Sequence, residues 1–162
     1  MILGLIADSH DHMVHLGRAA KLFRAAGVTR VIHAGDMVSP AAIRVFEGFP
    51  VAAVFGNNDG ERLGLVRTVT AMGGRLDGDF LQLDIGALRL AVYHGTVPPL
   101  TESLIRGGLY RIVVHGHSHR VSQQRVGDTL ALNPGTAHGY GGPATAMVFD
   151  AAAQAVQVLD LT

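Results

Sequence analysis

Five short segments of this chain share one form: an apolar run that ends in Asp, Asn or His beside a glycine or a second residue of metal-ligating type. Buried strands of an open α/β sheet are short apolar runs, and ligands bind just beyond the carboxyl ends of its parallel strands. We therefore expect the five polar ends to converge at one sheet edge and form a metal centre. They are Asp8-Ser9-His10, Gly35-Asp36, Gly56-Asn57-Asn58-Asp59, His94-Gly95 and Gly116-His117-Ser118-His119.

The composition narrows the class of protein. With 162 residues, 48% hydrophobic and 16% charged, the chain is predicted to form one globular domain over residues 1–162. The formal net charge is zero and the pI is about 7.1, which gives no electrostatic case for a nucleic-acid or anionic-membrane surface. Cysteine is absent, so disulfides are excluded and any metal must be held by nitrogen and oxygen ligands.

The sequence also bears on location. No apolar stretch approaches the ~20 residues of a membrane-spanning helix, and Asp8 and His10 interrupt the apolar N-terminal segment too early for a signal peptide. We therefore expect a cytoplasmic protein with no membrane segment. The sequence leaves open whether the protein forms a homo-oligomer.

Hydrophobic periodicity and turn residues predict the secondary structure. Leu16, Ala19, Ala20 and Phe23 recur at helical spacing, and Gly27 is expected to follow the last residue of that helix. Ser39 and Pro40 are expected to begin a second helix, as N-cap and first helical residue. The expected helices are 14–26, 39 to about 47, 63–72 and 100–106. The expected strands are 3–7, 30–34, 51–55, 80–85, 88–93, 112–115, 121–126, 129–132, 144–149 and 155–159.

The order of these elements predicts the fold class. Strands and helices alternate in the first half, whereas the second half is rich in strands. This order predicts an α/β fold: a layered double β-sandwich of mixed sheets flanked by helices. The Gly-rich segment 135–143 is expected to form a loop at the site.

The spacing of the polar residues predicts the kind of metal site. Asp8 and His10 are two residues apart and can face one ion from a single loop, and His117 and His119 repeat this spacing. Asp36 and Asn57 each follow a glycine, which lets backbone approach closely. Seven ligands are too many for one transition ion, but they suit two ions that share a carboxylate. The candidate ligands are Asp8, His10, Asp36, Asn57, His94, His117 and His119.

In this order the five segments resemble the motifs of the calcineurin-like metallophosphoesterases. The compact size and Asn133-Pro134-Gly135-Thr136 resemble the small bacterial and archaeal phosphodiesterase branch. The resemblance extends over essentially the whole chain. The fold of that family is a double β-sandwich flanked by helices, in agreement with the fold predicted from the order of elements.

The resemblance implies how the ligands divide between two divalent ions, with Asp36 as the bridge and a hydroxide held between the ions as the nucleophile. The expected metal is Mn, and Fe, Zn, Co and Ni are alternatives that suit mixed Asp, Asn and His ligands. One site would consist of Asp8, His10, Asp36 and His119, and the other of Asp36, Asn57, His94 and His117.

The sequence departs from the wider family at Asn58. Many members have a histidine there, which serves as phosphate binder and proposed general acid and is held by the following aspartate. Asn58 can donate a hydrogen bond to a phosphate oxygen but cannot deliver a proton as imidazolium can. Asn58 and Asp59 are the candidate catalytic side chains, although Asp59 can instead be a cap of the following helix.

The function expected first is a metal-dependent phosphodiesterase that acts on a small phosphodiester. One alternative is a phosphomonoesterase or nucleotide pyrophosphatase of the same superfamily. The other is a scaffold similar to the retromer subunit that shares this fold and has lost catalytic competence. A scaffold would be expected to have lost Asp or His ligands, and this chain has lost none.

Plain structural interpretations remain open for individual residues. Asp8 can cap the first helix, Asp36 can be a turn residue, and 133–135 can be a turn or the floor of the pocket. Histidine is frequent, at nine residues, and five of the nine are not candidate ligands. His33 and His115 are expected in the core or behind the ligands, and His12 and His15 in solvent or at the rim. His138 is left open as a residue that contacts substrate.

Overall fold

The computed structural model describes all of residues 1–162. The helices are α1 (Met13–Ala25), α2 (Pro40–Arg44), α3 (Arg62–Ala71) and α4 (Pro98–Arg106). The strands are β1 (Ile2–Ile6), β2 (Arg30–His33), β3 (Val51–Ala53), β4 (Arg75–Leu76), β5 (Phe80–Ile85), β6 (Leu88–Tyr93), β7 (Ile112–Val114), β8 (Val121–Val126), β9 (Thr129–Pro134), β10 (Thr145–Asp150) and β11 (Ala155–Asp160).

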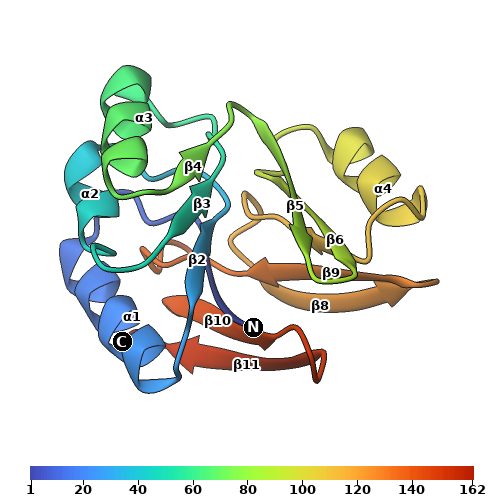
Figure 1. Cartoon of the computed structure of the whole chain (residues 1–162). Coiled ribbons are helices and arrows are strands. Elements are labelled where there is room, and N and C mark those ends of the chain that lie inside the picture. The colour runs from blue at the N-terminus through green and yellow to red at the C-terminus, as the bar shows by residue number, and fades with distance from the viewer.

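Two mixed sheets face each other between two layers of helices (Figure 1). The first sheet has the strand order β11-β10-β1-β2-β3-β4, and the second has the order β5-β6-β7-β9-β8. Strands β1 to β4 are parallel, as are β6, β7 and β9, whereas β10, β11, β5 and β8 pair antiparallel. Helices α1 to α3 cover the outer face of the first sheet, and α4 lies against the second. The predicted layered α/β double β-sandwich is confirmed.

One strand was not predicted, and the ends of two other elements need correction. The two-residue strand β4 was not predicted, because two residues are too few to show a periodicity. Helix α2 ends at Arg44 rather than near Gly48, and the chain continues through turns to Phe49. Strand β9 continues through Asn133 and Pro134, so the interpretation of 133–135 as a turn is wrong. A proline is tolerated at position 134 because it is the last residue of β9, where it pairs with Val121, the first residue of β8.

The alternation of side chains along the strands builds two cores. In β1, Leu3 and Leu5 belong to a cluster of 19 buried side chains between the sheets. Ile6 belongs to a cluster of 24 beneath helices α1 to α3. By contrast, only three buried side chains lie under α4, so that helix is the most thinly packed layer.

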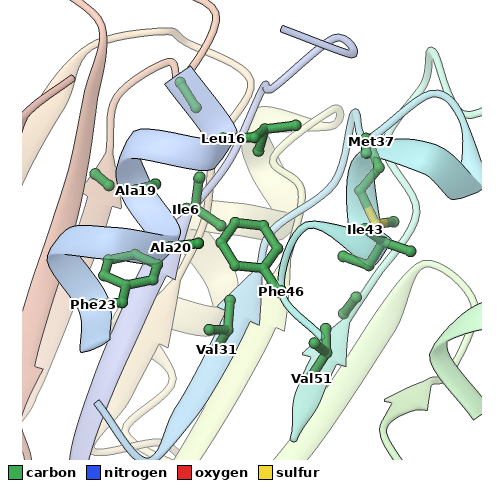
Figure 2. Close-up of a cluster of buried hydrophobic side chains, with 14 of the residues drawn as sticks. Ile6, Leu16, Ala19, Ala20, Phe23, Val31, Met37, Ile43, Phe46 and Val51 are labelled. Carbon is green, nitrogen blue, oxygen red and sulfur yellow. The ribbon is translucent and has the colours of Figure 1, made fainter. Parts of the chain in front are cut away.

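The face of α1 that the sequence predicted to be buried does pack on the first sheet. Leu16, Ala19, Ala20 and Phe23 are all buried, and Figure 2 shows them directed at the strands beside Phe46 from the segment after α2. The rings of Phe23 and Phe46 stack with centroids 6.1 Å apart.

Gly27 ends α1 as predicted. Its φ is +69°, in the left-handed region that glycine adopts without steric cost. Its amide donates to Arg24 O, and the amide of Val28 donates to Phe23 O. These two bonds form a Schellman motif, which satisfies the last carbonyls of the helix. Among the four helices, none is long and apolar enough to cross a bilayer.

Candidate metal centre

The loops that follow β1, β2, β6 and β7 meet and are tied together by hydrogen bonds. The amides of Asp8 and His10 donate to Gly35 O and Asp36 O, both at 3.0 Å. The amide of His117 donates to Asp8 Oδ2 at 3.0 Å and thereby joins a loop of the second sheet to one of the first. The convergence predicted for the polar strand ends is therefore present.

Two carboxylates and three imidazoles form the centre of this convergence. Asp36 Oδ2 lies 3.6 Å from His10 Nε2 and 3.5 Å from His94 Nε2. Asp8 Oδ1 lies 3.3 Å from His119 Nε2 and 3.9 Å from His94 Nε2. Two sets of possible ligand atoms lie within 4.8 Å of one another, Asp8 with His10 and His119, and Asp8 with Asp36 and His94.

The other two predicted ligands, Asn57 and His117, lie at the wall of the site. Both are exposed and line an open cavity of about 440 Å³ that Asp36, His10 and His119 also line. The ring of His117 is 5.1 Å from that of His94, centroid to centroid. All seven predicted ligands thus lie at this centre or on the cavity above it.

Two buried atoms show that this residue set fits a divalent cation. Asp8 Oδ1 and His94 Nε2 are inaccessible to solvent, and neither has a hydrogen-bond partner in the protein. His94 Nδ1 donates to Ala34 O at 2.7 Å, which places the ring proton on Nδ1 and turns the Nε2 lone pair toward the carboxylates. Metal-binding histidines are oriented in the same way by a backbone carbonyl.

The electrostatics of the centre make metal binding compete with protonation of its side chains. Burial raises the pKa of Asp8, although His94 and His119 act to lower it. Burial has the same effect on Asp36, but the neighbouring His94 imidazole and the hydrogen bonds from Asn58 prevail and hold the pKa of that carboxyl well below its usual range. Burial alone would lower the pKa of His94, but Asp36 and Asp8 raise it. In the metal-free protein a cation therefore competes with a proton on His94.

Five of the seven predicted ligands have a left-handed backbone. The φ angles are +52° at Asp8, +41° at His10, +58° at Asp36, +67° at His117 and +58° at His119. They make up most of the eight non-glycine residues with positive φ in the chain. Such conformations cost roughly 1–3 kcal/mol each and gather at functional sites.

Two glycines allow the backbone to pack closely beneath the predicted ligands, as the sequence indicated. A Cβ on Gly56 would fall on the Asp36 carboxylate. A Cβ on Gly35 would come within 2.7 Å of both Gly56 N and His94 Nδ1, and the φ of Gly35 is +98°. Neither position can carry a side chain without displacing a predicted ligand.

Comparison with known proteins identifies the family. A family model described as the calcineurin-like phosphoesterase superfamily domain matches residues 1–154. The chain belongs to the calcineurin-like phosphoesterase superfamily. A protein named phosphodiesterase MJ0936, from Methanocaldococcus jannaschii, is 36% identical over 143 residues, which cover 86% of each chain.

Solved structures agree with this assignment. A structure described as a novel archaeal phosphodiesterase superposes with a TM-score of 0.93 at 33% identity, over 99% of each chain. Vps29 from Entamoeba histolytica, complexed with Zn²⁺, superposes with a TM-score of 0.72 at 17% identity over 100% of each chain, which shows a shared fold. The resemblance that the motifs indicated is confirmed.

At this candidate site, Asn58 and Asp59 both support Asp36. Asn58 donates to both carboxylate oxygens of Asp36, through its backbone amide at 2.8 Å and its side-chain amide at 2.7 Å. Asp59 is 5% exposed and does not line the cavity. Its carboxylate accepts from the amides of Asp36 (3.0 Å), Val38 (2.7 Å) and Gly56 (2.7 Å).

Three capping predictions are settled by the hydrogen bonds. The N-cap of α3 is Glu61, so Asp59 is not the cap of that helix. The N-cap of α1 is His12, whose Nδ1 accepts from the amide of His15 at 3.3 Å, so Asp8 is not a cap either. Ser39 holds the N-cap position of α2 as predicted, but its hydroxyl donates to Asp11 Oδ1 at 2.9 Å and not to the helix.

His33 and His115 lie behind the centre, in agreement with the sequence-based expectation. His33 Nε2 pairs with Ser9 Oγ at 3.0 Å and its Nδ1 accepts from the amide of Gly35. Burial lowers the pKa of His33 to about 3. The side-chain amide of Asn133 donates to Gly116 O and Ser118 Oγ, both at 3.0 Å, and lies 3.3 Å from His115 Nδ1, and it thus braces the loop after β7.

The Gly-rich segment 135–143 forms part of the site, as predicted. His138 and Tyr140 line the cavity with the predicted ligands. Burial, followed by His10, His15 and His119, lowers the pKa of His138. Tyr140 is 71% exposed and its carbonyl contacts His119 Nδ1 at 3.3 Å. Tyr140 was not predicted from the sequence, where its signal was an aromatic residue within a glycine-rich loop.

Proposed function

We propose that this protein is a metal-dependent phosphodiesterase that hydrolyses small phosphodiesters with two divalent cations bridged by Asp36. The observation that carries the proposal is the position of Asp36 Oδ2, 3.6 Å from a histidine of one proposed site and 3.5 Å from a histidine of the other. The relative that is 36% identical and named a phosphodiesterase supports the choice of diesters.

The proposed ligands divide as the sequence indicated. Mn is the metal we expect, and the protein is expected in the cytoplasm. When bound, two such ions supply charge stabilisation for the phosphoryl oxygens and activation of water. One ion would be held by Asp8, His10, Asp36 and His119, and the other by Asp36, Asn57, His94 and His117.

The residues of the chain itself position the substrate. Asn58 lies on the cavity, and its side-chain amide can turn from Asp36 to a phosphoryl oxygen. Asp59 is a positioning residue, because it fixes the amides of Asp36 and Gly56. Neither Asn58 nor Asp59 is an imidazole that delivers a proton to the leaving oxygen, so we expect a preference for substrates with good leaving groups.

Metal analysis tests the bridging role of Asp36. The wild-type protein should bind two divalent ions per chain, Asp36→Ala should lose both, and His10→Ala should mainly lose one. Asp84→Ala, at an exposed carboxylate far along β5, is the matched control and should still bind two. At most one ion in metal-replete wild-type protein would contradict the two-ion proposal.

A substrate series tests the reaction. The Mn-loaded protein should hydrolyse bis(p-nitrophenyl) phosphate, and its rate on aryl methyl phosphates should fall steeply as the pKa of the leaving phenol rises. Turnover of p-nitrophenyl phosphate but of no diester would support the monoesterase alternative. Lack of activity towards every phosphoester would support the alternative that the protein is a scaffold. A flat leaving-group dependence, with chemistry rate-limiting, would indicate an acid, and His138 is the candidate because it lines the cavity.

A further inference from the structure

A cleft of about 340 Å³ lies beside the proposed metal centre, between α4 and β8. Its two hydrophobic lining residues are Ile105 and Val126, and most of the others carry hydrogen-bonding side chains. His117 lines both this cleft and the cavity above the predicted ligands. The two recesses therefore meet at a proposed metal ligand.

Helix α4 separates this cleft from an apolar groove. Pro98, Thr101 and Ile105 recur at helical spacing and line the cleft, whereas Leu100 and Leu104 line the groove on the other side of the helix. Glu102 and Arg106 also line the cleft, so the side of α4 that faces it carries polar groups among apolar ones. A ligand that extends from the metal centre along this helix meets hydrogen-bonding groups.

Several of these groups are free to bind a ligand. The Asn133 side-chain amide donates to Ser118 Oγ at 3.0 Å, so the Ser118 hydroxyl can still donate its own proton. The side chain of Gln124 makes no hydrogen bond within the protein. Glu102 and Arg106 pair at 2.8 Å and balance each other's charge. The cleft therefore offers a few uncharged donors and acceptors, together with the mutually paired charges of Glu102 and Arg106.

Resting on the proposed function, we propose that this cleft binds one ester substituent of the phosphodiester and selects a polar substituent of nucleoside size. A diester carries two substituents on phosphorus, and the cleft adjoins the place where that phosphorus would lie. Its volume is at the low end of the roughly 300–1,000 Å³ of ligand pockets, which suits one substituent rather than a whole ligand. A monoester lacks the second substituent and gains nothing from the cleft.

Two diesters with the same leaving group test this selection. We expect kcat/KM for thymidine 5′-(p-nitrophenyl phosphate) to exceed that for methyl p-nitrophenyl phosphate by about tenfold, the effect of one or two neutral hydrogen bonds. Gln124→Ala should reduce this ratio about threefold to tenfold. Gln124→Trp should remove it by filling the cleft.

Gln123 supplies the matched control. It precedes Gln124 on β8 and is also exposed, but it does not line the cleft. Gln123→Ala and Gln123→Trp should keep the wild-type ratio. Equal values of kcat/KM for the two diesters in wild-type protein, or equal effects of the Gln123 and Gln124 variants, would overturn the proposal.

A binding measurement separates this proposal from the proposed function. Thymidine carries no phosphate, so its binding to the metal-free protein does not depend on the metal centre. At millimolar thymidine we expect NMR shifts in the amides of 101–106 and 115–126, which Gln124→Trp abolishes. Such shifts in a protein that hydrolyses no diester would support nucleoside binding in the cleft and contradict the proposed phosphodiesterase function. Diester hydrolysis with no nucleoside preference and no such shifts would contradict nucleoside binding in the cleft but not the proposed function.

Discussion

The Asp59 carboxylate accepts three backbone amide protons from the loops after β2 and β3, and all three of its hydrogen bonds are to backbone. One of its partners, Val38, has a φ of +79°, which a β-branched residue adopts only where its surroundings impose it. We expect Asp59→Ala to lower the free energy of unfolding by at least about 2 kcal/mol, because it leaves buried amides without an acceptor. Denaturant unfolding measures the change, and metal affinity should fall with it.

Glu61→Ala is the control for this prediction. Glu61 holds the N-cap position of α3 but makes no capping hydrogen bond, and it is exposed. Its removal should change stability by less than about 0.5 kcal/mol. Equal losses in the two variants would mean that the Asp59 carboxylate does not organise the loops.

His33 gives the protein a pH-dependent stability. Its pKa is about 3 in the folded protein and ordinarily 6.5, so below pH 6.5 the unfolded chain takes up a proton that the folded protein does not. The contribution of His33 to stability is therefore complete at neutral pH and is lost as the pH falls from about 6.5 toward 3. Relative to His33→Asn, the chelator-treated wild type should lose about 2 kcal/mol between pH 7.5 and pH 5.

This difference between the two proteins isolates His33, since the other titrating groups are common to both. The side-chain oxygen of the asparagine in His33→Asn can still accept from the amide of Gly35, but that side chain does not titrate in this range. Urea unfolding of both proteins at each pH measures the difference. A constant difference across this range would show that the buried imidazole is not held neutral.

At the scale of residues, the sequence predicted which side chains gather at the site but not their backbone conformations. Asp8, Asp36 and the His117-x-His119 pair were named from their type and spacing, and all lie at the site. Their left-handed φ angles were not predictable, because the surrounding hydrogen bonds impose a conformation that the residues themselves disfavour. The predicted catalytic role of Asp59 stays a prediction, and the structure adds its contacts with the amides of the neighbouring loops.

Among the elements, β1 and α1 are expected to respond in opposite ways to the same substitution. A Cβ on Gly4 would come within 2.9 Å of three carbons of the Phe23 ring, whereas one on Gly17 in α1 would have nothing within 4 Å. We expect Gly4→Ala to destabilise the fold by about 1–3 kcal/mol through overpacking. Gly17→Ala should stabilise it by about 0.5–1 kcal/mol through helix propensity.

Thermal or denaturant unfolding of the two variants measures both effects, and each variant is a control for the other. Gly17 is partly exposed on α1 and lies away from the proposed ligands, so metal content should be unchanged in Gly17→Ala. Destabilisation by both substitutions would mean that α1 does not pack on the first sheet as Figure 2 shows.

Element types were predictable wherever a segment carried a full period of hydrophobic residues. The hairpin of β5 and β6 around Gly86 and the face of α1 are examples. Boundaries failed where tertiary contacts decide them. Strand β4 is only Arg75–Leu76 paired beside β3, and Asn133 remains in β9 while its side chain braces the loop after β7.

For the whole molecule, the two sheets could be predicted as layers, but the strand order and the facing loops could not. That order depends on contacts such as the amide of His117 on Asp8 Oδ2 and His94 Nδ1 on Ala34 O, which join residues 109 and 60 positions apart. Short apolar strands do not specify such partners. The seven proposed ligands therefore come from both sheets, four from the loops after β1, β2 and β3 and three from the loops after β6 and β7.

This division predicts that metal binding stabilises the entire sandwich. An ion that binds only the folded protein adds about 2.7 kcal/mol at a free concentration of 100 Kd, which corresponds to a rise in Tm of about 5–10 °C for a chain of this size. We expect chelation to lower the Tm of the Mn-loaded protein by such an amount, and hydrogen exchange to quicken in both β1–β2 and β6–β7. Asp36→Ala should show neither response. Protection in only one sheet, or an equal Mn effect in Asp36→Ala, would contradict a centre that joins the two sheets.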